Sequence, residues 1–410
     1  MPYFILLSTD NKIRGMLKKL GPGLLVAAAG IGAGDMIIGI QIGLDFQWVF
    51  VAAVLLATVL KYIITVGIAK FQIETGTSII QFWNTKIPFW LRLIFILFFL
   101  IWSFMVGAAL LSASGLAANS LLPFWSKETW AVVHSLLAFL MIYFGKYQSI
   151  ENLTKVLILL LFVILIPTAL VLLFKSETSS EIVSAAYDTP TLIMSIIGGV
   201  GGSVTMLSYT YWLEEKNWNK ENLMPEVRFD LRFSYFITAL FIFALMIIAS
   251  RLDMQSGELN GSKLIFSLGE VIGNVLGSSL KLLFKICFWG VAFSSVITVW
   301  SGVPYLFQDF YQGIFKSKSR SNVSPAASKQ YRAFLLFISI APLILTFLQN
   351  TIKNVINYTL ISSIFVVGIS VTLLLLSGKK GKISNDVFSK FILAISVLVF
   401  ASLLLWQVFH

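Results

Sequence analysis

The sequence predicts an all-α polytopic membrane protein of about eleven transmembrane helices, arranged as two five-span halves of opposite orientation. Three observations support this fold class. Of the 410 residues, 58% are hydrophobic and only 12% are charged, which is too apolar for a soluble domain that must cover its core. Apolar stretches long enough to cross a bilayer recur along the chain. The first and sixth stretches also carry similar glycine clusters, as in inverted-repeat membrane proteins.

The apolar stretches divide the chain into one integral unit with short connections. A first five-span repeat is expected at 21–174 and a second, inverted one at 191–377, preceded by a cytoplasmic segment at 1–20 and followed by an eleventh span at 387–410. Each stretch is matched to the roughly 30 Å thickness of the hydrocarbon core. The predicted spans are 21–43, 47–70, 93–116, 130–145, 153–174, 191–213, 231–250, 280–306, 331–349, 354–377 and 387–408.

The net charge of +11 is explained by membrane topology rather than by a nucleic-acid partner. Most Lys and Arg residues fall in segments that are cytoplasmic if the N-terminus is cytoplasmic, as the positive-inside rule requires. The loop 309–330 and the segment "SGKKGK" carry many of them. We expect a multi-pass protein of a bacterial inner membrane, with lipid and a small ion or solute as its partners. Its oligomeric state is left open.

The sequence offers no catalytic site, and an enzyme is not expected. It contains no nucleophile and base pair at a known spacing, no phosphate-cradling loop and no hydrolase metal motif. The single cysteine, Cys287, cannot form an intramolecular disulfide. We expect no resident cofactor.

Two glycine clusters predict helix breaks inside the membrane. They read "AGIGAG" at 29–34 and "GGVGGS" at 198–203. Each glycine in a helix interior costs up to about 1 kcal/mol relative to alanine, so this density favours local unwinding. The breaks are expected at Gly32 and Gly34 in the first span, and in the sixth span at Gly199, Gly201 and Gly202. The alternative is that the glycines form packing seams between helices.

Asp35 is the only acid well inside a predicted span. Burying a charge at a helix centre costs about 2.5 to 3.5 kcal/mol, which favours a functional role in binding a cation or a substrate. The alternative is a structural ion pair with Lys61, the only basic side chain that could reach it within the membrane. Helix counting places Lys61 closer to the cytoplasm than Asp35.

Oxygen atoms around Asp35 are expected to complete a site for a hard cation. The candidates are the freed carbonyls of residues 29–32, including Gly30 and Gly32, and the hydroxyls of Ser294 and Ser295. Such ligands suit Na⁺, Mg²⁺ or Mn²⁺. The serines could instead serve only helix packing.

The break in the sixth span suggests a second type of cargo. Ser208 and Tyr209 would begin a half-helix whose free amides favour anionic groups. A small zwitterion such as an amino acid could place its carboxylate there and its amine near Asp35. A cation site and a site for an organic solute therefore both stay open.

Three segments resemble the Nramp family of divalent-metal transporters. "GPGLLVAAAGIGAGDMIIGIQIG" at 21–43 resembles the first span of that family, "GSVTMLSYTYW" at 202–212 is similar to the sixth and "GVAFSSVITVWSG" at 290–302 to the eighth. The resemblance covers spans 1 to 10 and is weakest after residue 330. It implies a LeuT-type inverted-repeat fold with interrupted spans 1 and 6. It also implies secondary transport of a divalent cation of the Mn, Mg or Fe class by alternating access.

The residues at the family's motif positions depart from its pattern. The family's Asp-Pro-Gly-Asn is replaced here by residues 32–35, so that the carboxylate of Asp35 stands three residues later. The family's Met-Pro-His reads Met206, Leu207, Ser208. The resemblance thus implies Asp35 and Met206 as metal ligands, with Ser208 at the imidazole position.

The residues that serve proton movement in the family are also missing. No acid occurs in 93–116 and no histidine in 191–213. Transport without the usual proton coupling is therefore expected, with Na⁺ or H⁺ as candidate coupling ions. The main alternative is a Na⁺- or H⁺-coupled carrier of a small organic solute, and a further one is a transporter-derived protein that no longer transports.

Overall fold

A computed structural model describes residues 21–32, 34–144, 147–175, 187–216, 223–252, 262–315, 328–377 and 387–409. Within these ranges every regular element is a helix. The helices are α2 (Pro22–Ile31), α3 (Gly34–Leu44), α4 (Trp48–Thr75), α5 (Ile79–Lys86), α6 (Phe89–Leu121), α7 (Lys127–Phe144), α8 (Tyr147–Phe174), α9 (Thr189–Gly199), the 3₁₀ helix η1 (Val204–Ser208), α10 (Tyr209–Lys216), α11 (Leu223–Ala249), α12 (Ser262–Leu276), α13 (Ser278–Phe315), α14 (Lys329–Ile340), α15 (Leu343–Leu348), α16 (Thr351–Leu376) and α17 (Val387–Phe409).

Most predicted spans correspond to a helix that could cross a membrane. In the described residues eight helical segments are long and apolar enough, and a ninth is obtained if α2 and α3 form one bent span. The fourth and eleventh predicted spans correspond to α7 and α17, which are not among these eight segments. The polar first turn of α7 holds Lys127 and Glu128, and α17 contributes a shorter apolar stretch, Val387–Leu403.

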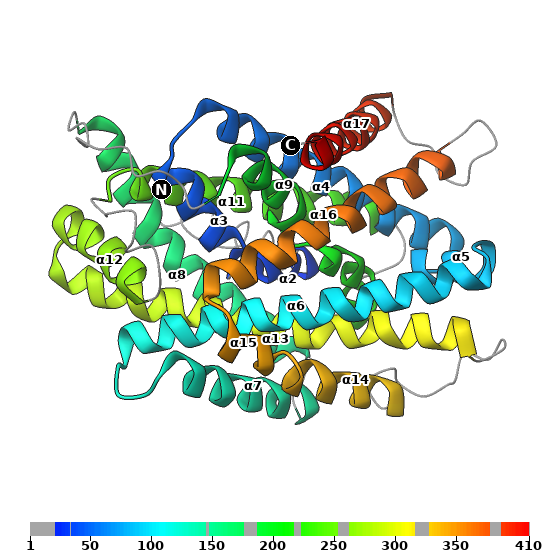
Figure 1. Ribbon diagram of the computed structural model, residues 1–410, viewed down its shortest axis with the longest axis horizontal. Helices are drawn as coiled ribbons and strands as arrows, with labels where there is room; N and C mark the ends of the chain where they lie inside the picture. The colour runs from blue at the N-terminus through cyan, green and yellow to red at the C-terminus, as the bar shows by residue number, and fades with distance from the viewer. Residues whose placement is uncertain are drawn as a thin grey trace, which may run out of the picture.

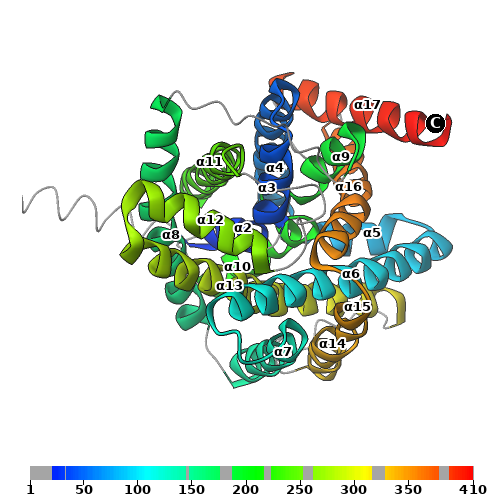
Figure 2. The same cartoon turned by 60° about the vertical axis from the view of Figure 1, so that its left-hand side comes forward.

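The two halves of the first span lie at the centre of the bundle (Figures 1 and 2). Every residue of α2 and of α3 is buried, because both helices are largely apolar and other helices of the protein surround them. The helix α2 packs against α8, α11 and α13, and α3 packs against α9, α11 and α16. α7 and α14 lie on one flank of the molecule and α17 on the opposite flank.

Two helices lie in stretches where no span was predicted. The short helix α5 follows α4 and begins with a capping box, in which Ser78 and Gln81 each satisfy a backbone amide of the other. The helix α12 precedes α13 and buries Leu264, Leu268 and Ile272, which recur every four residues on one face. Neither is long enough to appear as a membrane span in a hydropathy profile.

The helix α11 begins at Leu223, well before the predicted start of the seventh span at residue 231. The extension places Asp230 inside the helix, where it is fully buried. Asp35 is the only acid within the predicted spans, but Asp230 is a second buried acid on a helix that continues into one of them. Hydropathy detects only the apolar part of such a helix, whereas its polar first turns are held by contacts to other segments.

Candidate functional site

The first helix break brings the backbone of the first span close to that of the sixth. The helix α2 ends at Ile31 and α3 begins at Gly34, with the two axes bent by 49°. A Cβ atom at Gly30 would lie 2.9 Å from Asp35 Oδ2 and 3.2 Å from the carbonyl carbon of Gly201. A glycine at position 30 is thus required for the close approach of the two segments.

The second break separates α9 from η1. Gly199 is the last residue of α9, and η1 begins at Val204. Between them Gly201 and Gly202 have φ angles of +68° and +83°, in the left-handed region that favours glycine. Both spans that carry the glycine clusters are therefore interrupted, and their interruptions face each other.

Asp35 joins the two breaks. It lies in the first turn of α3, is fully buried, and both of its carboxylate oxygens accept a hydrogen bond from the amide of Gly201, at 3.1 and 3.3 Å. A carboxylate is favourable at a helix N-terminus, where unpaired amides leave a partial positive charge. Asp35 thus ties the start of α3 to the segment that follows α9.

Lys61 lies at the same junction. It stands halfway along α4, is fully buried, and its ammonium group donates to the carbonyl oxygens of Gly198, at 3.1 Å, and of Gly202. Asp35 and Lys61 attract each other electrostatically, but the ammonium's hydrogen bonds go to the α9 end and not to the carboxylate. Lys61 therefore contacts the backbone at the end of α9 and after it, in the region where the Gly201 amide bonds to Asp35.

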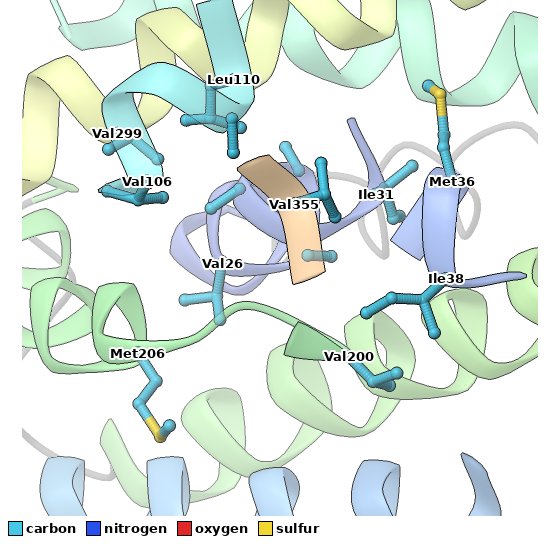
Figure 3. Close-up of a cluster of buried hydrophobic side chains, with 14 of the residues drawn as sticks. Val26, Ile31, Met36, Ile38, Val106, Leu110, Val200, Met206, Val299 and Val355 are labelled. Atoms are coloured by element: carbon cyan, nitrogen blue, oxygen red, sulfur yellow. The ribbon is translucent and has the colours of Figure 1, made fainter. Parts of the chain in front are cut away.

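Buried apolar side chains lie on the segments that meet at the junction. Figure 3 shows Val26 and Ile31 of α2 and Ile38 of α3, with Val200 and Val355 close by. All five are buried. In such surroundings the effective dielectric constant is low, so Asp35 and Lys61 act on each other and on any bound ion more strongly than in water.

Of the two predicted serines, Ser295 reaches the first span. Its hydroxyl donates to the carbonyl of Ala28 in α2, and at 3.2 Å to Val291 in its own helix. Ser294 donates to Val291 at 2.8 Å and serves only α13. Gly32 packs at the same place, since a Cβ atom there would lie 3.0 Å from the Val291 carbonyl oxygen.

Met206 and Ser208 are not brought to the carboxylate in this conformation. Both are fully buried. The Met206 side chain points away from Val26 and α2, toward α4 (Figure 3). The Ser208 hydroxyl has no hydrogen-bond partner among the described residues, and a Cβ atom at Gly302 of α13 would lie 2.7 Å from it. The α-helical half of the sixth span, α10, begins at Tyr209 as expected, and the 3₁₀ helix η1 precedes it from Val204 to Ser208.

Two tyrosines near the carboxylate were not predicted. Tyr235 of α11 and Tyr358 of α16 lie close enough to Asp35 for its charge to act on their hydroxyl groups. The Tyr235 hydroxyl is 2.7 Å from Oγ1 of Thr65, and the Tyr358 hydroxyl packs against Gly34. A tyrosine in an apolar span gives no signal of its own, since only the fold places it beside an acid.

Asp230 is a second buried acid at the first span. Its carboxylate accepts the amides of Gly21, at 2.9 Å, and Gly23, at 2.7 Å, and Tyr209 donates to it at 3.3 Å. It thereby satisfies amides at the N-terminal end of α2 that have no partner within the helix. The buried positions Val227 and Leu231 show the helical spacing that could have placed Asp230 on the inner face of α11.

The Asp230→Asn variant should loosen the N-terminal end of α2. The amide side chain of asparagine offers one acceptor oxygen and no charge, so it binds the amides of α2 more weakly. A loss of about 1.4 kcal/mol of this stabilisation would raise the fraction of molecules with a detached N-terminal end of α2 about tenfold. In a Cys287→Ser background carrying Val26→Cys, we expect a water-soluble maleimide to label the new cysteine about tenfold faster. Glu226→Gln, a matched change one turn earlier in α11, should leave the rate unchanged. Equal rates in both variants would mean that Asp230 does not hold α2.

Gly201→Ala should disrupt the second break. Its left-handed φ costs a residue with a side chain about 1 to 2 kcal/mol, and a Cβ atom there would lie 2.7 Å from Tyr235 Cε1. We expect a lower unfolding temperature in detergent. Gly368→Ala is the matched control, because no atom lies within 4 Å of its Cβ position in α16, and its unfolding temperature should be unchanged or slightly higher. A Gly201→Ala variant as stable as Gly368→Ala would contradict the observed break.

Comparison with known proteins identifies a family and a fold. The sequence model of the family described as natural resistance-associated macrophage protein-like (Nramp) matches residues 23–410. No curated protein sequence is significantly similar to the chain.

Solved structures of low sequence identity share the fold. A manganese transporter of Eremococcus coleocola, in complex with an aromatic bis-isothiourea compound, superposes with a TM-score of 0.72 at 15% identity, covering 95% of this chain and 86% of that one. MhsT in complex with L-phenylalanine gives 0.62 at 16% identity, over 93% and 97%. A nucleobase-cation-symport-1 family transporter gives 0.54 at 13% identity, over 94% and 92%. The fold is thus the expected LeuT type.

Proposed function

The chain belongs to the Nramp family of membrane transporters, and from this premise we propose that it carries a divalent cation of the Mn, Mg or Fe class by alternating access. The observation that carries the proposal is the fully buried Asp35 carboxylate at the junction of two helix breaks. Irregular backbone at membrane depth is tolerated where it lines a site, and transporters of this architecture bind their cargo there.

The cation would be held by hard oxygen ligands. Asp35 supplies the charge, and backbone carbonyls at the end of α2 and the Ser295 hydroxyl lie on the α13 side of the break. These oxygen types suit Mg²⁺ or Mn²⁺. Met206 would contribute its sulfur only if η1 turns during the cycle, because it points away from α2 here.

Alternating access would require α2 to move relative to its neighbours. Hydrogen bonds hold both of its ends: the amides of Gly21 and Gly23 bond to Asp230, and the Ala28 carbonyl accepts from Ser295. Breaking the bonds to Asp230 would free the half-helix on that side while Asp35 stays with α3. We propose that this movement opens a path from the site.

Flux into proteoliposomes tests the proposal. The panel is Mn²⁺, Mg²⁺, Fe²⁺ and amino acids, each with and without a pH or Na⁺ gradient. We expect uptake of at least one divalent cation and no dependence on the pH gradient, since the spans lack the family's acids and histidines for proton movement. Absence of flux for every compound would instead support a protein that has lost transport.

A small zwitterionic solute is the second candidate cargo. The specific observation is Lys61, whose positive charge attracts Asp35 and would repel a divalent cation bound beside it. A solute with no net charge would not meet that repulsion. Uptake of an amino acid with no uptake of divalent cations would favour this candidate.

We further propose that the protein resides in a bacterial plasma membrane with its N-terminus in the cytoplasm. The placement of basic residues supports this orientation. The two five-span repeats are proposed at 21–174 and 191–377. A reporter fused before residue 21 and active only in the cytoplasm would check the orientation.

A further inference from the structure

The ammonium group of Lys61 occupies a position built for a cation. The carbonyls of Gly198 and Gly202 accept its protons, and they belong to the C-terminal end of α9 and to the unwound segment that follows. A helix C-terminus carries a partial negative charge, and carbonyls freed by unwinding are cation ligands in membrane transporters. The carboxylate of Asp35 adds a full negative charge nearby.

We propose that Lys61 is a tethered cation that takes the place of a bound monovalent coupling ion at the break between α9 and η1. The inference rests on the proposed transport function. It means that the sixth-span break is charge-balanced by the chain itself, so that the transport cycle proceeds without binding Na⁺ or K⁺ there. Lys61 acts as a positioning residue, because it holds the break and the Asp35 carboxylate in their arrangement.

The burial of Lys61 supports a role for its positive charge. A lysine halfway along a membrane helix is costly unless its ammonium group is satisfied; here two carbonyls accept its hydrogen bonds and the nearby Asp35 carboxylate attracts its charge. Besides Lys61, the groups near Asp35 from other elements are the neutral amide of Gly201 and the hydroxyls of Tyr235 and Tyr358, which carry no charge when protonated. Lys61 is therefore the positive charge at this junction among the described residues.

The test is whether removing the tethered charge creates a need for a free cation. Lys61→Ala leaves the carbonyls and Asp35 in place and opens space for an ion. We expect its unfolding temperature to rise by about 3 °C or more when NaCl or KCl replaces choline chloride at constant ionic strength. The wild type, Lys61→Arg and Lys353→Ala, an exposed lysine of α16, should show no such rise.

Two outcomes would overturn the proposal. One is a wild type or Lys61→Arg protein that Na⁺ or K⁺ stabilises more than choline does. The other is a folded Lys61→Ala protein that responds equally to all three salts. If Lys61→Ala does not fold in any salt, the wild type and Lys61→Arg decide the question. Because unfolding temperatures need no cargo, a failed flux experiment would leave this result intact.

Discussion

Asp35→Ala should reduce divalent-cation flux by about 100-fold or more when equal amounts of folded protein are compared. Asp35 is the charged group among the proposed ligands, and losing about 3 kcal/mol of cation stabilisation corresponds to about a 100-fold change in affinity. Flux into proteoliposomes at equal protein density measures the effect, and the size-exclusion profile reports folding.

Asp45→Ala is the matched control for this change. Asp45 follows the end of α3, is partly exposed and accepts a hydrogen bond from Gln47 at 2.9 Å. Its removal should leave the flux unchanged. Flux of Mn²⁺ that persists in Asp35→Ala would exclude the carboxylate as a cargo ligand.

Lys61→Met should destabilise the protein by about 3 kcal/mol or more. The methionine fills most of the volume of the lysine stem but leaves the Asp35 carboxylate buried without its positive partner, and breaking a buried pair on one side is strongly destabilising. The unfolding temperature and the yield of monodisperse protein measure the loss. The double variant Asp35→Asn/Lys61→Met should recover stability, because neither charge is then left alone.

Flux distinguishes the two roles of Asp35 in the same experiment. We expect the double variant to fold well but to carry no divalent cation, since the ligand is absent. If the double variant recovers both stability and flux, Asp35 serves only as a structural partner of Lys61.

The architecture could be predicted because it depends on features that hydropathy and composition report. Apolar length sets the spans, and the glycine clusters at 29–34 and 198–203 lie where α2 and α9 end. The start of α11 and the existence of α5 and α12 could not be predicted in this way. The polar first turns of α11, for example, are held by a specific contact, in which Asp230 accepts hydrogen bonds from the amides of Gly21 and Gly23.

The site was only partly predictable, because a sequence gives residue types but not directions. Asp35 was identified from its charge in an apolar span, but its bond to Gly201 depends on how the two breaks face each other. The sequence left open whether Lys61 pairs with Asp35. Its ammonium binds carbonyls that are free only because α9 unwinds. The sequence likewise does not show that Met206 lies in a 3₁₀ helix or that its side chain points away from α2.

Anomalous X-ray scattering from crystals grown with Mn²⁺ tests most directly whether the paired breaks form the cargo site. We predict one strong Mn²⁺ peak within direct coordination distance of the Asp35 carboxylate, which disappears in Asp35→Asn crystals grown in the same way. A peak elsewhere in the protein, or none beside Asp35 at Mn²⁺ concentrations that saturate transport, would contradict the assignment of this site.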